Sequence, residues 1–139
     1  MWWIFAAALA IRLALVPLPG YDVGAFRAWS DAMAREGLTR AYELELDPAI
    51  NYPPVPLYVF FGLGTIHRAF VTPAADAVVP ASWIKLTVIA FELMTILTLA
   101  VLIRRAEAPD SHGALIWTAA YAFHPAIIWN TAYWAASTR

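Results

Sequence analysis

The chain has 139 residues, of which 62% are hydrophobic and only 14% are charged. A soluble domain is typically about 45–50% apolar and about 25% charged, so this composition indicates a membrane protein. The formal net charge of -1 lacks the basic excess that nucleic-acid binding requires, and the absence of cysteine excludes disulfide bonds and thiolate sites. We therefore expect membrane lipids, and no nucleic acid, among its partners.

The first apolar run, residues 2–18, reads WWIFAAALAIRLALVPL. The run is long enough to cross the roughly 30 Å hydrocarbon core of a bilayer as a helix. No basic segment precedes it, and Pro17 and Pro19 stand where a signal peptide would have small residues for cleavage. We therefore predict a retained transmembrane helix over 2–18.

Residues 20–51 form the only long polar stretch, and a loop of that size on a small membrane protein usually carries function. Within it, VGAFRAWSDAMAREG (23–37) has helical periodicity, because Phe26, Trp29 and Met33 share one face. Another face carries three charged residues at intervals of four, spaced for salt bridges: Arg27, Asp31 and Arg35. The pattern predicts a short amphipathic helix that lies on the membrane surface.

The segment NYPPVPLYVFFGLGTIH (51–67) predicts a second interfacial helix over 54–70. Its prolines suit the start of a helix, and Tyr52 and Tyr58 suit the headgroup region of a bilayer. The glycines within the run weaken a long rigid span. The alternative is that 54–70 crosses the membrane.

Two further apolar runs, 82–103 and 114–130, are predicted to span the membrane, and each has a tryptophan near one end. Lys85 and Glu92 are seven residues apart and share one face of the first of these helices. Charges inside a span are by default paired or functional, so we expect Glu92 to be buried with Arg12 or Lys85 as its partner. Lys85 would either meet a lipid phosphate or extend to the interface.

Arg104 and Arg105 form the one basic pair that directly flanks a predicted span, which places the 104–113 loop in the cytoplasm. Residues 20–81 then lie outside, with 54–70 along the interface. The predicted fold is an all-α polytopic bundle of about three transmembrane helices, with two interfacial helices in a long first external loop. The alanine-rich composition favours a prokaryotic plasma membrane.

The order of these segments resembles the GT-C glycosyltransferases, which are polytopic membrane enzymes. GYDVGAFRAW (20–29) opens the loop, AYELELDPAINYPP (41–54) closes it, and a helix starts at Tyr-Pro-Pro, as in the first external loop of that family. WIKLTVIAFELMTILTLAVLIRR (83–105) is similar to the family's Lys-Leu span with an internal acid and a basic end. FHPAIIWNTAYWAASTR (123–139) is similar to a family segment containing Asn-Pro and then Tyr-Trp-Gly-Gln. The likeness is greatest to the dolichyl-phosphate-glucose and -mannose transferases and their prokaryotic relatives.

The resemblance implies transfer of a hexose, such as mannose or glucose, from a polyprenyl-phosphate carrier to a lipid-linked glycan or other hydroxyl acceptor outside the membrane. It implies no cofactor. By residue match, the family's loop aspartate, which is assigned the role of general base, falls on Asp22. The alternative from the residues alone is that Asp22 caps the 23–36 helix. The expected substrate-binding residues are Arg27, Trp29, Tyr52, Pro53, Pro54 and Lys85.

Other interpretations of these residues stay open. Arg27 and Trp29 also fit a surface salt bridge and an interfacial anchor, and Tyr52 with the prolines also fits a rigid turn into an ordinary helix. Arg12 fits a structural charge that faces the bundle. No metal site is expected, because the three histidines lack ligand spacing: His67, His112 and His124.

The chain departs from the family pattern in several places. His124 stands where asparagine is common, Ala135 and Ala136 replace Gly-Gln, and Asn51 replaces an aspartate. Family members are also several hundred residues long, so the chain resembles an N-terminal piece. A non-enzymatic alternative is a small helical subunit or transporter fragment, in which a network of three buried charges would join the helices: Arg12, Lys85 and Glu92.

The predicted topology can be tested with single cysteines at positions 45 and 75, because the chain has no cysteine of its own. Both should react with a membrane-impermeant thiol reagent applied from outside, since both lie in the predicted external loop. Protection at position 75 with reaction at position 45 would show that 54–70 crosses the membrane.

Overall fold

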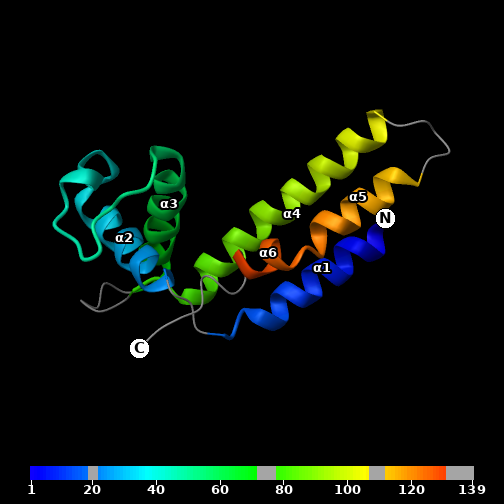
Figure 1. Cartoon of the computed structure of the whole chain (residues 1–139). Helices are drawn as coiled ribbons and strands as arrows, with labels where there is room; N and C mark the ends of the chain where they lie inside the picture. Colours follow the sequence, from blue (N-terminus) through cyan, green and yellow to red (C-terminus); the bar gives the residue numbers. More distant parts are fainter. Residues whose placement is uncertain (19–21, 72–77, 107–111, 131–139) are drawn as a thin grey trace. The chain divides into compact units, whose positions relative to one another are not determined.

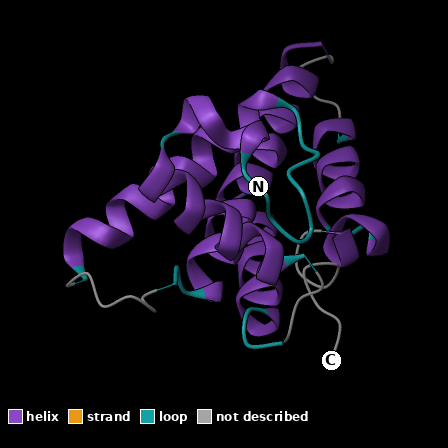
Figure 2. Ribbon diagram, turned by 90° about the vertical axis from the view of Figure 1, so that its left-hand side faces the viewer, coloured by secondary structure: helices purple, strands orange, loops and turns teal. Residues whose placement is uncertain are grey.

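The computed structural model describes residues 1–18, 22–71, 78–106 and 112–130, and within these ranges it contains helices and no strands (Figures 1 and 2). The all-α prediction is therefore confirmed for this part of the chain. The elements follow in the order α1 (Trp2–Leu15), α2 (Val23–Glu36), η1 (Leu38–Glu43), α3 (Pro54–Phe70), α4 (Ala81–Ala106), α5 (Gly113–Ala122) and α6 (Pro125–Ile128).

The chain forms two compact units. Unit 1 consists of Met1–Gly20 and Lys85–Arg139, and unit 2 consists of Tyr21–Ile84. Unit 2 coincides closely with the predicted external loop 20–81. The topology probe at position 75 lies outside the described residues.

One described helix, α4, is long and apolar enough to cross a membrane. It has 26 residues, and its span window has a mean hydropathy of 2.4. The apolar helices α1, with 14 residues, and α5, with 10, are shorter. At 1.5 Å per residue α1 covers only about 21 Å of the ~30 Å hydrocarbon core. Of the three predicted spans, only 82–103 therefore corresponds to a helix of crossing length.

The third predicted span, 114–130, is wrong as a continuous helix. α5 ends at Ala122, and α6 begins again at Pro125. A proline has no N–H for the helical ladder and disfavours helical backbone in the residue before it, and His124 accordingly has an extended conformation with ψ 123°. The Nδ1 atom of His124 accepts a hydrogen bond from the Ala126 N–H at 3.2 Å and caps α6.

Unit 2 is built on the packing of α2 against α3, which lie side by side in Figure 1. The two helices begin where the sequence predicts, at Val23 and Pro54. Trp29 and Met33 of α2 are buried in one core with Leu57 and Phe60 of α3. The apolar face of α2 is thus covered by protein, whereas the sequence pattern assigned it to the membrane surface.

Gly64 allows this close approach of the two helices. A Cβ atom added to Gly64 would lie only 2.0 Å from the carbonyl oxygen of Ser30 on α2. Any larger residue would therefore push α3 away from the α2 backbone. The glycine that the sequence suggested as a weakness of a span is instead the contact point of a helix pair.

The first turn of α4 belongs to unit 2. Ile84 is buried in the same core as Trp29, and the ring of Trp83 meets that of His67 edge-on at 5.6 Å between centroids. Arg27 Nε of α2 donates a hydrogen bond of 2.6 Å to the carbonyl oxygen of Val79, just before α4. These contacts hold the beginning of the apolar helix against α3.

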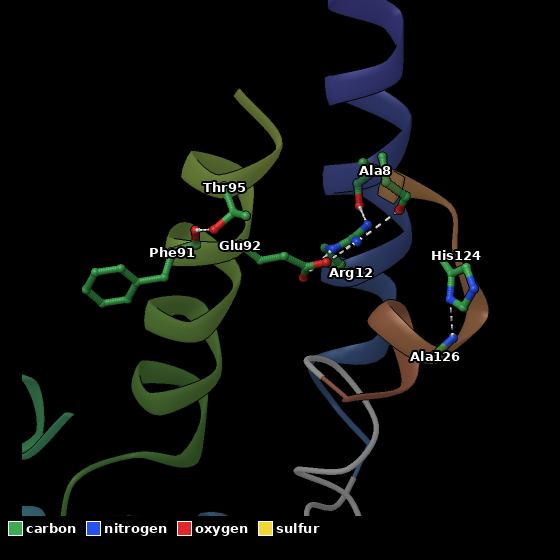
Figure 3. Close-up of polar contacts among 8 residues, drawn as sticks. Ala8, Arg12, Phe91, Glu92, Thr95, His124 and Ala126 are labelled. Carbon is green, nitrogen blue, oxygen red and sulfur yellow. Dashed lines mark hydrogen bonds and ion pairs between the residues drawn. The ribbon is translucent and has the colours of Figure 1, made fainter. Parts of the chain in front are cut away.

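In unit 1, an ion pair between Arg12 of α1 and Glu92 of α4 is fully buried (Figure 3). Arg12 Nε donates to Glu92 Oε2 at 2.7 Å, and a terminal nitrogen of Arg12 donates to Oε1 of the same carboxylate. Its terminal nitrogens also donate to the carbonyl oxygens of Ala8 and Ala122, each at 3.0 Å. The prediction that Glu92 is buried with Arg12 as its partner is confirmed.

Lys85 has a different role from either of those expected. Its side chain is buried, and its Nζ donates to the carbonyl oxygens of Val16, at 3.1 Å, and Leu18. These carbonyls follow the C-terminal end of α1, where helices leave acceptors without intrahelical donors. Lys85 thus ties the end of α1 to α4.

Glu92→Gln tests the buried ion pair. The substitution leaves the Arg12 guanidinium buried without its carboxylate, so the free energy of unfolding should fall by about 3–5 kcal/mol. Glu43→Gln is the control, because it removes only an exposed contact with Arg40 at 3.7 Å and should cost less than about 1 kcal/mol. Equilibrium denaturation in detergent micelles measures both.

A double variant, Arg12→Met with Glu92→Met, separates loss of charge pairing from loss of packing. With both charges removed, no buried ion is left unpaired, and most of the lost stability should return. Equal effects of Glu92→Gln and Glu43→Gln would contradict the buried pair.

Candidate functional site

Asp22, the predicted general base, stands at the N-cap position of α2. Its carboxylate makes no capping hydrogen bond to the backbone N–H groups of the helix. The capping role that the residues alone suggested is therefore not realised through the side chain. The half-buried Asp22 lies at the N-terminus of α2, which is the positive end of the helix dipole.

Four aromatic rings of unit 2 form a cluster next to this helix start, here called the aromatic cluster: Phe26, Trp29, Tyr52 and Phe60. Phe26 stacks on Phe60 at 4.8 Å between ring centroids, and Tyr52 meets the edges of Phe26 at 5.4 Å and Trp29 at 5.6 Å. Because α2 contributes two rings and α3 one, the packing of these helices places the Tyr52 ring.

Tyr52 links the aromatic cluster to Asp22. Burial raises the pKa of the Tyr52 phenol above its ordinary value of 10.0, and the negative charge of Asp22 raises the pKa further. Asp22 lies one helical turn before Phe26, and the ring of Phe26 meets that of Tyr52. At neutral pH the phenol is protonated and can donate a hydrogen bond, whereas an ionised Asp22 can only accept one.

The loop before α3 holds Tyr52 in place. The Tyr42 hydroxyl of η1 donates a hydrogen bond of 2.8 Å to the Tyr52 carbonyl oxygen. Pro53 and Pro54 follow directly, and Pro54 is the first residue of α3. Both prolines are exposed. Because the ring of a proline restricts its backbone, they fix the direction of the chain beside the cluster, as expected for a helix start.

Trp29 lies inside the core of unit 2 and not at an interface. Only 2% of it is exposed, and its indole N–H donates to the carbonyl oxygen of Pro48 at 2.8 Å. Direct substrate contact through Trp29 is therefore wrong for this structure; the residue instead supports the Tyr52 ring. Arg27 is half-buried, with its Nε directed to Val79.

Asp31 differs from the predicted row of surface salt bridges. Its carboxylate is buried and pairs with Arg35 at 2.6 Å and with Arg68 of α3 at 3.2 Å. Arg27 is directed elsewhere and does not join this pair. Asp31 thus helps to lock α2 onto α3, through a partner that lies 37 residues away in the sequence.

The structure brings Asp22, Tyr52, Pro53 and Pro54 into one region of unit 2, with Arg27 and Trp29 as supports on α2. Lys85 belongs to unit 1 and binds backbone carbonyls there. Sequence reasoning missed Phe60, although its spacing of three from Leu57 and four from Gly64 marks the buried face of α3. Within the described ranges no group of three or more acidic or histidine side chains could hold a metal ion.

The titration of Tyr52 makes the stability of the folded state depend on pH. A raised pKa means that the folded state holds the phenolic proton more tightly than the unfolded state. This contribution to stability is complete below pH 10 and is lost as the pH rises through the folded-state pKa. Carbon NMR of labelled tyrosines, assigned with Tyr52→Phe, should show Tyr52 titrating above an exposed tyrosine such as Tyr58.

Asp22→Asn should lower the Tyr52 pKa towards 10.0 without restoring it fully, because burial is the larger cause of the shift. Glu45→Gln is the matched control on an exposed acid of the same unit and should leave the titration unchanged. An unchanged Tyr52 pKa in Asp22→Asn would show that the two groups are not neighbours.

Comparison of the chain with protein-family models, with curated proteins and with solved structures gives no match.

Proposed function

We propose that the chain is the N-terminal part of a GT-C type membrane glycosyltransferase. It transfers a hexose such as mannose or glucose from a polyprenyl-phosphate carrier to a lipid-linked glycan or other hydroxyl acceptor. Unit 2 is the catalytic loop, located outside a prokaryotic plasma membrane. The observation that carries the proposal is the position of Asp22, whose carboxylate is not used for capping, one helical turn before Phe26, whose ring meets that of Tyr52.

Asp22 takes the role of general base. In the transfer, the acceptor oxygen forms a bond to the anomeric carbon of the sugar while the bond from that carbon to the phosphate oxygen breaks. The leaving phosphate takes the bonding electron pair, and Asp22 accepts the proton of the acceptor hydroxyl.

The aromatic cluster is proposed as the sugar platform. Tyr52 is the half-exposed member, with 36% of its surface accessible, while Trp29 and Phe60 support it from the core. A hexose has apolar C–H faces and hydroxyl edges, so an aromatic ring with a protonated phenol offers it both contact surface and a hydrogen-bond donor.

The leaving phosphate needs a cation or oriented donors. Arg27 is the proposed contributor from unit 2, because it lies on the same helix as Asp22 and is half-buried. Its Nε is held by the Val79 carbonyl, so a phosphate contact would use the terminal nitrogens. Lys85 is not part of this proposal, since its Nζ is occupied by carbonyls of the α1 end.

The alternative, a non-enzymatic subunit or transporter fragment, is favoured by one observation, the buried Arg12–Glu92 pair. The expected three-charge network is incomplete, because Lys85 bonds to backbone carbonyls instead of Glu92. The pair is enclosed by the carbonyls of Ala8 and Ala122, which suits a structural link between helices better than a charge that moves during transport.

Asp22→Asn in the complete protein encoded by the gene tests the base role. The transfer rate from polyprenyl-phosphate-mannose or -glucose should fall by about 10²–10⁴-fold, because removal of a positioned base has that effect. Donor binding and membrane insertion should be unchanged. Rates are measured with radiolabelled donor in purified, reconstituted enzyme.

Glu45→Gln is the control in this experiment, because it removes an exposed carboxylate of the same unit. Asp31 is unsuitable, since its buried ion pairs make a substitution there destabilising. A rate above about a tenth of the parental rate in Asp22→Asn would refute the base role. Absence of transfer by the parental enzyme with either donor would refute the proposed donors.

A further inference from the structure

A groove in unit 1 lies between the second half of α4 and the helices that follow it in the chain. Its volume is about 700 Å³, which falls within the range of about 300–1,000 Å³ that is typical of small-molecule sites. α4 and α5 form its two sides, and α6 with the turn before it contributes the rest (Figure 1). The groove lies within unit 1 and shares no residue with the candidate site of unit 2.

The two sides of the groove differ in chemistry. Leu99 and Ile103 are four residues apart on α4, so they share one face of that helix and give an aliphatic side. Trp117 and Tyr121 are four residues apart on α5 and give an aromatic side. Trp117 is 61% exposed, so its ring is accessible to a ligand. A planar ring suits this groove, because aromatic rings stack on one another and bury a large apolar area.

The backbone break between α5 and α6 supplies the groove with a hydrogen-bond donor. His124, which lines the groove, uses its Nδ1 atom to accept the Ala126 N–H at 3.2 Å (Figure 3). In the neutral imidazole the ring proton is then on Nε2, which is a donor. No residue in the described ranges accepts a hydrogen bond from that nitrogen. The exposed His124 can therefore donate to a ligand.

Tyr121 adds a second donor three residues before His124. Its half-buried side chain lines the groove, and its phenol can both donate and accept a hydrogen bond. Two donors in an otherwise apolar groove match a ligand that carries a carbonyl oxygen, because the two lone pairs of that oxygen can accept from both.

The same features disfavour the other possible occupants. The alkyl chain of a lipid would cover both donors with hydrocarbon, and a buried donor without an acceptor is unfavourable. Water would satisfy the donors but would leave the apolar sides wet, which is also unfavourable. α4 is the described helix of crossing length, and Leu99 and Ile103 belong to its apolar sequence. We therefore expect a ligand that reaches the groove from the lipid.

We propose that the groove binds a planar, lipid-soluble ring that carries a carbonyl oxygen, as quinones do. The ring lies between Trp117 on one side and Leu99 and Ile103 on the other. Its carbonyl oxygen accepts hydrogen bonds from His124 Nε2 and from the Tyr121 hydroxyl. Sugar transfer and the residues of unit 2 play no part in this binding, so the groove and the proposed function can be tested separately.

Fluorine NMR of the complete chain, labelled with fluorotryptophan and held in detergent micelles, tests the groove. Trp117→Phe and Trp29→Phe assign the two tryptophan signals that are compared. The probe is menadione, a methylated naphthoquinone, and the matched compound is methylnaphthalene, which has the same rings and no carbonyl oxygen. With menadione the Trp117 signal should shift in a saturable manner, while the signal of Trp29, which is buried in unit 2, should stay in place.

Methylnaphthalene should bind at least about tenfold more weakly than menadione, because it leaves both donors without an acceptor. Equal affinities for the two compounds would overturn the proposal. A Trp117 shift that rises with menadione without saturation would also overturn it, because it would show partition into the micelle. Tighter binding of decane than of menadione would assign the groove to alkyl chains and would overturn it as well.

Two variants test the hydrogen bonds without emptying the groove. Tyr121→Phe removes only the hydroxyl, and His124→Ser removes the ring but keeps a side chain that can cap α6. Each should weaken menadione binding by about 2–10-fold, as the loss of one hydrogen bond does. Each should leave methylnaphthalene binding and the helical content measured by circular dichroism unchanged. Unchanged menadione binding in both variants would refute the assigned donors.

Discussion

The packing of α2 on α3 is the constraint on which the candidate site depends. The helices approach so closely at Gly64 that the Ser30 backbone fills the space of a side chain, and Asp31 joins them through Arg68. This contact stacks Phe26 on Phe60 and leaves Tyr52 against both Phe26 and Trp29. The relation between Tyr52 and Asp22 follows from helix packing and not from local sequence.

The buried charges of the protein are used mainly to join segments. Arg12 and Glu92 satisfy each other within unit 1, and Lys85 satisfies the carbonyls that follow α1. In each case the cost of burying an ion is offset by hydrogen bonds to groups that would otherwise lack partners. Asp22 is different, because its carboxylate has no capping role and lies beside a surface ring.

Local features of the fold could be predicted from the sequence. The periodicity of Phe26, Trp29 and Met33 gives α2, and the prolines after Tyr52 give the start of α3, because both signals depend on residues within one or two turns. The pairing of Glu92 with Arg12 could also be predicted from the sequence, since few partners exist for an acid inside an apolar helix.

The remaining features depend on contacts that the sequence pattern does not show. Trp29 was expected to bind substrate or, alternatively, to anchor the helix at an interface, but only the position of α3 reveals that its ring is covered. Lys85 binds backbone oxygens, which every residue has and no sequence motif marks. The break at Pro125 was overlooked because hydropathy measures side chains, whereas the break is a property of the backbone.

The hydrogen bonds of Arg12 set an order for the assembly of the helices of unit 1 during synthesis. The carboxylate partner of Arg12 lies 80 residues later in the chain, and the Ala122 carbonyl lies 110 residues later. Synthesis proceeds at about 5–20 residues per second, so the guanidinium waits several seconds for these groups. During that time the Arg12 guanidinium lacks these partners, and its hydrogen bonds join α1 to the rest of unit 1 only after α4 and α5 have been made.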